Sequence, residues 1–152
     1  MTIREIVNLL VRCFENGNKV LICGNGGSAA QSQHMAAELM GRFELDRPPL
    51  PAIALSTDTS FLTAWSNDVS FGEIFERQVQ ALGKPGDVLI VFSTSGKSRN
   101  CLLAIDQARI SGLEVVDWPR THVTTAHIQE KQLEEMHKVV RQVERKMYAD
   151  IV

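Results

Sequence analysis

The chain has 152 residues, of which 44% are hydrophobic and 22% are charged, and its formal net charge is −2. This balance predicts one soluble globular domain over residues 1–152 and excludes a basic surface that would attract nucleic acid. No apolar stretch approaches the ~20 residues that span a bilayer, so we expect no membrane partner and a cytoplasmic location. The three scattered cysteines fit reduced thiols in a reducing compartment.

The spacing of hydrophobic residues predicts helices that alternate with short strands. An amphipathic helix over 3–15 comes first, and a buried strand over 19–23 follows it. The elements expected next are a helix over 28–42, a strand over 52–55, helical segments over 59–66 and 72–83, a strand over 88–92, a helix over 98–111, a strand starting at 114–116 and a helix over 126–149. This alternation predicts an α/β fold, a three-layer α/β/α sandwich around a parallel sheet of four to five strands.

A glycine-rich turn, Gly24-Asn25-Gly26-Gly27-Ser28, follows the first strand. It matches a dinucleotide-binding loop poorly, because alanine replaces the third glycine and no acidic residue ends the next strand at the usual distance. A tight turn between strand and helix explains Gly24, but it leaves the polar Asn25 and Ser28 unexplained. We therefore favour a small anionic or polyhydroxylated ligand.

A second turn, STSGKS over 93–98, follows the strand at 88–92 and begins a helix. Backbone N–H groups at a helix start bind phosphate without help from a lysine. Simple N-capping needs only one hydroxyl, whereas this turn offers four, from Ser93, Thr94, Ser95 and Ser98. We therefore favour phosphate binding, and we expect both turns to face the same edge of the sheet.

Imidazole, carboxylate and amide groups form two further pairs. His34 and Glu38 are four residues apart on one helix, so they share a face and could bind one zinc ion or form an ordinary surface pair. Arg42 could equally be the ion-pair partner of Glu38. Gln129 and His137 would lie about 12 Å apart along a regular helix, so both reach one metal only with fully stretched side chains. A helix that starts after Gln129, or donation from two subunits, would ease this.

Four segments together resemble the phosphoheptose isomerases, which are sugar-isomerase (SIS) domain proteins. They are GNGGSAAQSQHMAAELMGRF, PAIALSTDTSFLTAWSNDVSFGEIF, STSGKS and IQEKQLEEMH. The resemblance implies a homotetramer with sites between subunits and a small phosphorylated sugar as substrate. It implies conversion of sedoheptulose 7-phosphate to D-glycero-D-manno-heptose 7-phosphate through an enediolate, for lipopolysaccharide heptose synthesis.

The resemblance also implies the roles of individual residues. One zinc ion per site would be held by His34, Glu38, Gln129 and His137, and Glu38 and His137 would act as the acid/base pair. The implied substrate contacts are Asn25, Gly26, Gly27, Ser28, Glu38, Arg42, Asn67, Asp68, Ser93, Thr94, Ser95, Ser98 and Gln129. Taken alone, the pair Asn67-Asp68 is equally well explained as a turn or cap.

The chain departs from the family after Val116, where a stretch of family positions is absent. Either residues are deleted here or a loop is missing between 116 and 117, and the intact ending IQE…H favours the missing loop. A non-catalytic SIS protein that binds the bacterial replication initiator is an alternative, and so is a sugar-phosphate sensor without turnover. The initiator-binding branch lacks counterparts of Glu38 and His137, which favours the enzyme.

Overall fold

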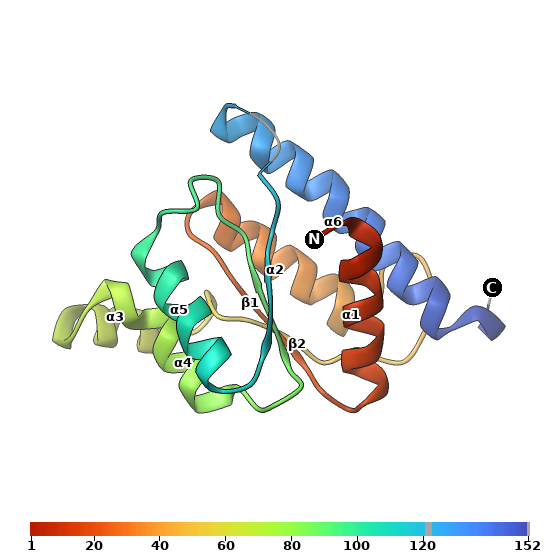
Figure 1. Ribbon diagram of the computed structural model, residues 1–152, viewed down its shortest axis with the longest axis horizontal. Helices are drawn as coiled ribbons and strands as arrows, with labels where there is room; N and C mark the ends of the chain where they lie inside the picture. Colours follow the sequence, from red (N-terminus) through yellow and green to blue (C-terminus); the bar gives the residue numbers. More distant parts are fainter. Residues whose placement is uncertain (121–122, 152) are drawn as a thin grey trace.

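Four strands and six α-helices alternate along the chain, and the computed structural model describes residues 1–120 and 123–151 (Figure 1). The strands are β1 (Val20–Cys23), β2 (Ala52–Ala54), β3 (Val88–Val91) and β4 (Glu114–Asp117). The helices are α1 (Ile3–Glu15), α2 (Gly27–Met40), α3 (Thr59–Asp68), α4 (Ile74–Leu82), α5 (Arg99–Ile110) and α6 (Thr125–Met147), with short 3-10 helices η1 (Phe71–Glu73) and η2 (Ala149–Ile151). These bounds confirm the predicted order of elements.

The first helix illustrates how local sequence sets these bounds. Thr2 caps α1 by accepting a hydrogen bond from the backbone N–H of Glu5 (3.3 Å), and the Glu5 carboxylate accepts one from the backbone N–H of Thr2 (2.7 Å). This reciprocal arrangement satisfies two N–H groups that a helix start leaves without partners. The apolar face of α1 then carries Ile6 and Leu10 into the core.

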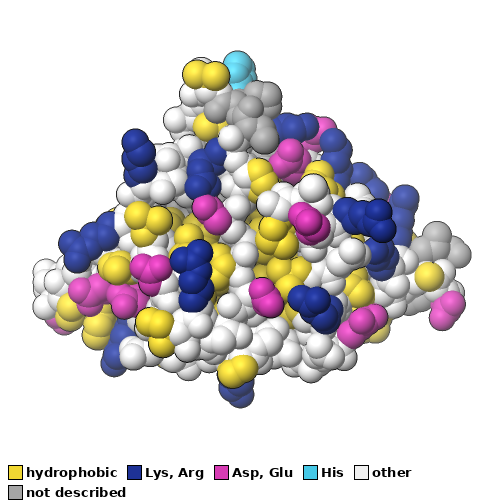
Figure 2. All heavy atoms as spheres, in the orientation of Figure 1, with side chains coloured by type: hydrophobic (Ala, Val, Ile, Leu, Met, Phe, Trp, Pro, Cys, Tyr) yellow, Lys and Arg dark blue, Asp and Glu magenta, His cyan; other side chains and the backbone are white. Residues whose placement is uncertain are grey.

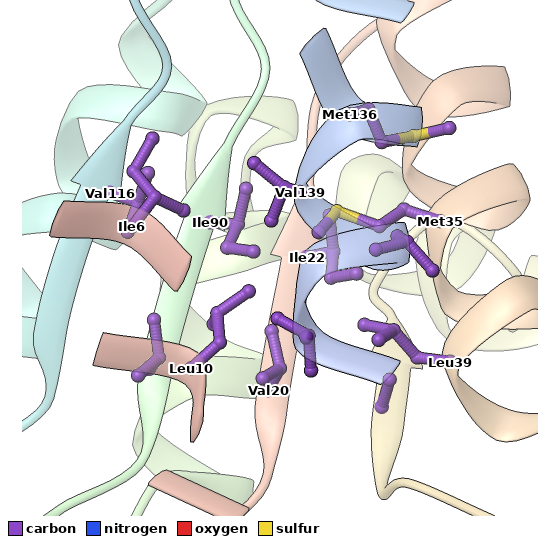
Figure 3. Close-up of a cluster of buried hydrophobic side chains, with 14 of the residues drawn as sticks. Ile6, Leu10, Val20, Ile22, Met35, Leu39, Ile90, Val116, Met136 and Val139 are labelled. Atoms are coloured by element: carbon purple, nitrogen blue, oxygen red, sulfur yellow. The ribbon is translucent and has the colours of Figure 1, made fainter. Parts of the chain in front are cut away.

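The sheet is buried on both faces. Val20 and Ile22 point to the side covered by α1, α2 and α6 (Figure 3), whereas Leu21 and Cys23 point to the side covered by α4 and α5. Because side chains alternate along a strand, one short apolar run supplies both cores. The predicted three-layer α/β/α sandwich is therefore confirmed, with four strands among the described residues.

The strand order β2-β1-β3-β4 places the two polar turns together. All the pairings are parallel, and β1 lies between β2 and β3. The chain leaves β1 toward one side of the sheet and later returns on the other side, which creates the type of switch point where α/β sheets bind ligands. At that edge the backbone N–H of Phe92 donates to the carbonyl of Cys23 (2.9 Å). The two turns therefore face the same edge, as predicted.

The predicted break after Val116 falls inside β4. Val116 pairs with Ile90 and Asp117 pairs with Val91, so the strand continues through the junction. The next residue, Trp118, is fully buried and lies against the ring of Phe92, with 4.9 Å between the centroids. Packing of this indole directs the chain from the sheet edge toward α6.

The surface and the thiols agree with the composition. Figure 2 shows Lys, Arg, Asp and Glu side chains of both signs interspersed over one face, with apolar side chains between them. All three cysteines are unpaired and buried, and burial raises the pKa of Cys13 to about 11. Within 1–120 and 123–151, the helices are too short or too polar to cross a bilayer.

A buried ion pair fixes the opposite edge of the sheet and provides a stability prediction. Asp87 accepts hydrogen bonds from the backbone N–H groups of Lys19 (3.0 Å) and Lys84 (2.8 Å) and from Asn18 Nδ2 (3.0 Å), and it pairs with Lys19 Nζ (2.5 Å). Burial alone would raise the pKa of Asp87, but these hydrogen bonds outweigh it, so the pKa lies below its ordinary value.

We expect Asp87→Asn to lower the free energy of unfolding by about 2–3 kcal/mol at neutral pH. Because the folded-state pKa of Asp87 is depressed, the ionised carboxylate stabilises the fold fully at pH values above the unfolded pKa near 3.8. This stabilisation is lost as the pH falls through the folded-state pKa. Urea unfolding between pH 3 and 7 should therefore show a shallower loss of stability with acid in the variant. An equal acid slope in both proteins would contradict this assignment.

Candidate active site at the edge of the sheet

The site is built by two helices that lie side by side, α2 and α6 (Figure 1). The side chain of Gln31 donates to the backbone carbonyl of Gln129 (2.7 Å), and further along both helices His34 Nε2 lies 3.4 Å from His137 Nε2. The two helices therefore run in the same direction. Since α6 begins at Thr125, close to the predicted start at 126, the alternative of a helix that starts after Gln129 is excluded.

His34, Glu38 and His137 form one cluster, which we call the triad. Glu38 Oε1 lies 2.8 Å from His34 Nε2 and 3.4 Å from His137 Nε2. The carboxylate is mostly covered, with 12% of its side chain exposed, whereas the two imidazoles remain 45% and 32% exposed. The triad thus combines a shielded carboxylate with two accessible rings, from segments about one hundred residues apart.

The triad fits a metal ion by its donor atoms. One ligand atom from each of the three side chains lies within 4.8 Å of the others. The second carboxylate oxygen, Glu38 Oε2, is buried and has no hydrogen-bond partner among the residues that the structure describes, and such an atom is stabilised by a cation or a proton donor. Two imidazole nitrogens and one carboxylate oxygen are the donor set that zinc takes in sites with an open position.

Gln129, the fourth expected ligand, has its amide against the start of α2. A Cβ atom on Gly27 would lie 2.4 Å from Gln129 Nε2, so the missing side chain of the glycine leaves the space that the amide fills. Gln129 therefore lies beside the glycine turn, about two helical turns before the level of His34 on α2.

Arg42 and Phe43 follow the C-cap of α2, Gly41. Arg42 is exposed and, within the described part of the chain, makes no ion pair, so the partners of Glu38 are the two histidines. The ring of Phe43 stacks on His137, with 5.4 Å between centroids and 9° between planes. Phe43 was not predicted as a site residue, because an isolated aromatic residue in a loop carries no motif.

The glycine turn and the hydroxyl turn together line a small cavity of about 60 Å³. Its walls are Asn25, Ser28, Phe92, Ser93, Thr94 and Ser98. Asn25 and the buried Asn100 exchange hydrogen bonds of 2.8 Å in both directions, which ties the glycine turn to α5. Gly24 allows the close approach, since a Cβ atom there would lie 2.7 Å from the carbonyl oxygen of Phe92.

The hydroxyl groups of the second turn are not explained by helix capping. Ser98 is the N-cap residue of α5, but its side chain makes no capping hydrogen bond. The hydroxyls of Ser93 and Ser95 accept from the backbone N–H groups of Gly96 (3.0 Å) and Lys97 (3.1 Å), which shapes the turn. The backbone N–H of Cys101 donates to Asn100 Oδ1 (2.9 Å), so the groups that could bind an anion at the start of α5 are the N–H groups of Arg99 and Asn100 and the Ser98 hydroxyl.

Asn67 and Asp68 are the last two residues of α3, so the predicted helical segment extends beyond residue 66. Asn67 donates to Asp68 (2.8 Å), and both side chains are exposed. Helix α3 projects from the rest of the chain on the left of Figure 1. Within one chain, this pair does not join the cavity or the triad.

Two further residues support the hydroxyl turn without any sequence signal. Arg120 lies over Gly96, with its Nη2 2.6 Å from the position of a Cβ atom there, and it pairs with Asp117 at 2.7 Å. Asn100 anchors Asn25, as described above. Both contacts depend on tertiary folding, and the glycine at 96, with its positive φ of 65°, allows the close approach of Arg120.

An α/β/α sandwich with two polar turns at the switch point has the architecture that binds small anionic ligands at this edge. The family model described as SIS domain matches residues 1–117, which end with β4. The class of the chain is thus an SIS domain.

Solved and curated relatives narrow the class. Phosphoheptose isomerase structures from Neisseria gonorrhoeae and Francisella tularensis superpose with TM-scores of 0.85 and 0.88, at 37% and 35% identity, over 93% and 94% of this chain and 84% and 85% of theirs. A phosphoheptose isomerase of Crocosphaera subtropica is 44% identical over 163 residues, covering 97% of this chain and 83% of the relative. The chain therefore belongs to the phosphoheptose isomerase family.

Two features of the alignments concern length. The alignment with the Crocosphaera relative is longer than the 152 residues of this chain, so that relative carries residues without a counterpart here. A Shewanella sediminis phosphoheptose isomerase is 53% identical over 115 residues, which is 76% of this chain and 58% of that relative. This alignment and the match to the family model both cover a smaller part of the chain than the Crocosphaera alignment does.

The two glycines of the first turn give a paired prediction. Gly24→Ala should lower the free energy of unfolding by about 2–3 kcal/mol, because the new methyl group meets the backbone carbonyl of Phe92. Gly27→Ala should change stability little, because it meets only the movable tip of Gln129. Urea unfolding of both variants measures the difference, and equal losses would contradict the placement of these groups.

Proposed function

We propose that the chain is a phosphoheptose isomerase that converts sedoheptulose 7-phosphate to D-glycero-D-manno-heptose 7-phosphate, in the cytoplasm and for lipopolysaccharide heptose synthesis. The observation that carries this proposal is the triad, a shielded carboxylate between two imidazoles. The triad and the anion cavity share one helix, since Ser28 lines the cavity and His34 follows it about 9 Å along the axis. This separation leaves room for a sugar chain between phosphate and reacting carbons.

The anion cavity supplies binding and orientation. The phosphate of the sugar binds at the start of α5 through backbone N–H groups and the hydroxyls of Ser93, Thr94 and Ser98. The remaining substrate contacts are Asn25, Gly26, Gly27, Ser95 and Gln129, with Arg42 at the open side. Because the phosphate does not react, its binding energy serves to place the sugar carbons at the triad.

The triad moves protons between carbon and oxygen. Glu38 takes the proton from C1 of the ketose while the oxygen on C2 receives one from His137, which gives the enediol. Protonation of C2 and loss of the proton on the C1 oxygen then give the aldose, so that no proton is gained or lost overall. Positioned acid and base groups of this kind typically contribute 10²–10⁴-fold in rate.

We include one zinc ion per site in this proposal, held by His34, Glu38 and His137. Because Gln129 lies about two helical turns from His34 in its own chain, it would serve as an additional ligand from a neighbouring subunit. When bound, a zinc ion polarises the substrate carbonyl and stabilises negative charge on oxygen. The two oxygens of Glu38 suit metal binding and proton transfer, because Oε1 faces the histidines and Oε2 is buried without a partner among the described residues.

We further propose a homotetramer with sites between subunits. Asn67 and Asp68 lie at the exposed end of α3, apart from the other substrate contacts of their own chain. A second copy would bring these two residues to a neighbouring site. Binding of the replication initiator is not favoured, because the similar proteins carry the name phosphoheptose isomerase.

The substitution Glu38→Gln tests the assignment of the base. The amide cannot take a proton from C1, so turnover of sedoheptulose 7-phosphate should fall by roughly 10²–10⁴-fold. Binding of the sugar phosphate, measured by calorimetry, should change much less, because the phosphate contacts are intact. Undiminished isomerisation would exclude Glu38 as the base, and binding without turnover in the unmodified protein would indicate a sensor.

The zinc proposal has a test that does not depend on turnover. His34→Gln should weaken zinc binding by roughly 10-fold or more, measured by competition with a chromophoric chelator. His127→Gln is a matched control at the start of α6, outside the triad, and should leave the affinity unchanged. Equal affinity of all three proteins would exclude the triad as the zinc site.

A further inference from the structure

The loop after α2 is tied to α6 by an ion pair that is removed from solvent. Arg47 Nε donates to Glu144 Oε1 at 2.9 Å, and the two side chains are 0% and 1% exposed. The same carboxylate accepts from the backbone N–H groups of Phe43 (2.9 Å), Glu44 (2.9 Å) and Leu45 (3.3 Å). The carboxylate of Glu144 therefore holds the backbone of residues 43–45 and the side chain of Arg47.

The ion pair acts directly on the end of α2. Arg47 Nη2 donates to the backbone carbonyl of Glu38 (2.7 Å), and its Nη1 donates to that of Leu39 (2.8 Å). The last carbonyls of a helix have no partner within the helix, and a guanidinium there stabilises both their hydrogen bonds and the helix dipole. The backbone of Glu38, one member of the triad, is thus held by Arg47.

The same ion pair acts on the other helix. Glu144 lies seven residues after His137, which is two turns along the same face of α6. It also holds the backbone of Phe43, whose ring stacks on the imidazole of His137. The guanidinium of Arg141 lies 5.5 Å from the centroid of the Phe43 ring. A continuous chain of contacts therefore links the carboxylate of Glu144, through Phe43, to the imidazole of His137.

We propose that Arg47 and Glu144 are positioning residues that set the placement of Glu38 relative to His137, with Phe43 as the contact between loop and imidazole. This inference rests on the proposed isomerase function. Proton transfer requires its groups within hydrogen-bond reach, and a displacement of about 1 Å lowers rates by roughly 10²-fold. The triad residues come from two separate helices, α2 and α6. A displacement of this size is therefore avoided only if contacts close to the triad fix the relative placement of the two helices.

A matched ion pair separates positioning from stability alone. Asp87, like Glu144, is a buried carboxylate that accepts from one cationic side chain and three further N–H donors, but it lies at the opposite edge of the sheet. We expect Glu144→Gln and Asp87→Asn to lower stability to urea by similar amounts. Only Glu144→Gln should lower kcat, by roughly 10–100-fold, with KM for sedoheptulose 7-phosphate within about 3-fold because the phosphate site is untouched.

A spectroscopic measurement reports on the triad without turnover. The ring protons of His137 experience the ring current of the stacked Phe43, and their NMR signals can be assigned by their loss in His137→Gln. At fixed pH these signals should move in Glu144→Gln and stay in place in Asp87→Asn. If the unmodified protein does not isomerise the sugar, the proposed function fails, and this measurement still decides whether Glu144 positions His137.

A milder variant covers the case in which Glu144→Gln does not fold. Phe43 is only partly buried, so Phe43→Leu should keep the fold, shift the His137 signals and lower kcat more than KM. Arg47→Lys keeps the charge but loses the planar group that donates to the carbonyls of Glu38 and Leu39. It should likewise shift the His137 signals and lower kcat more than KM. Unchanged His137 signals and kcat in Phe43→Leu, or equal kcat in the Glu144 and Asp87 variants, would overturn the proposal.

Discussion

The parallel packing of α6 against α2 is the constraint on which the site depends. The two helices belong to opposite ends of the chain, yet they meet turn by turn, Gln129 beside Gly27 and His137 beside His34. The contact is maintained by the core on this face of the sheet, where Met35 and Leu39 from α2 meet Met136 and Val139 from α6 (Figure 3). Apolar packing therefore brings the reactive groups together, and polar contacts then orient them.

The sheet supplies a second constraint, the edge at which both turns open. Since β1 and β3 are neighbours in register, the residues that follow them must emerge side by side. The reciprocal hydrogen bonds of Asn25 and Asn100 then fix the distance between the turns. The cavity that results needs no charged side chain in its wall, because N–H groups at the start of a helix already favour an anion.

Much of this arrangement could be predicted from the sequence because the signals are local. Apolar periodicity gave the helices and strands, and a turn directly after a strand had to face the ligand-binding edge. Spacing on one helix likewise placed His34 beside Glu38. Each of these inferences needs information from a dozen residues or fewer.

Contacts between distant segments could not be predicted in the same way. Arg47 and Glu144 are 97 positions apart, and each resembles an ordinary charged residue on a loop or helix. The position of Gln129 depended on where α6 begins and on the absence of a side chain at Gly27. These facts follow from how two helices pack, and helix packing angles and offsets are only weakly encoded in any single segment.

The proposed function also gives the substrate a direction. The N–H groups that begin α5 would bind the phosphate of a sugar phosphate, while the triad, which begins about 9 Å after Ser28 along α2, would face its hydroxylated end. The relative placement of α2, α5 and α6 would then set the direction of binding as well as the geometry of proton transfer. The ion pair of Arg47 and Glu144 holds the end of α2 beside α6 and so contributes to this placement.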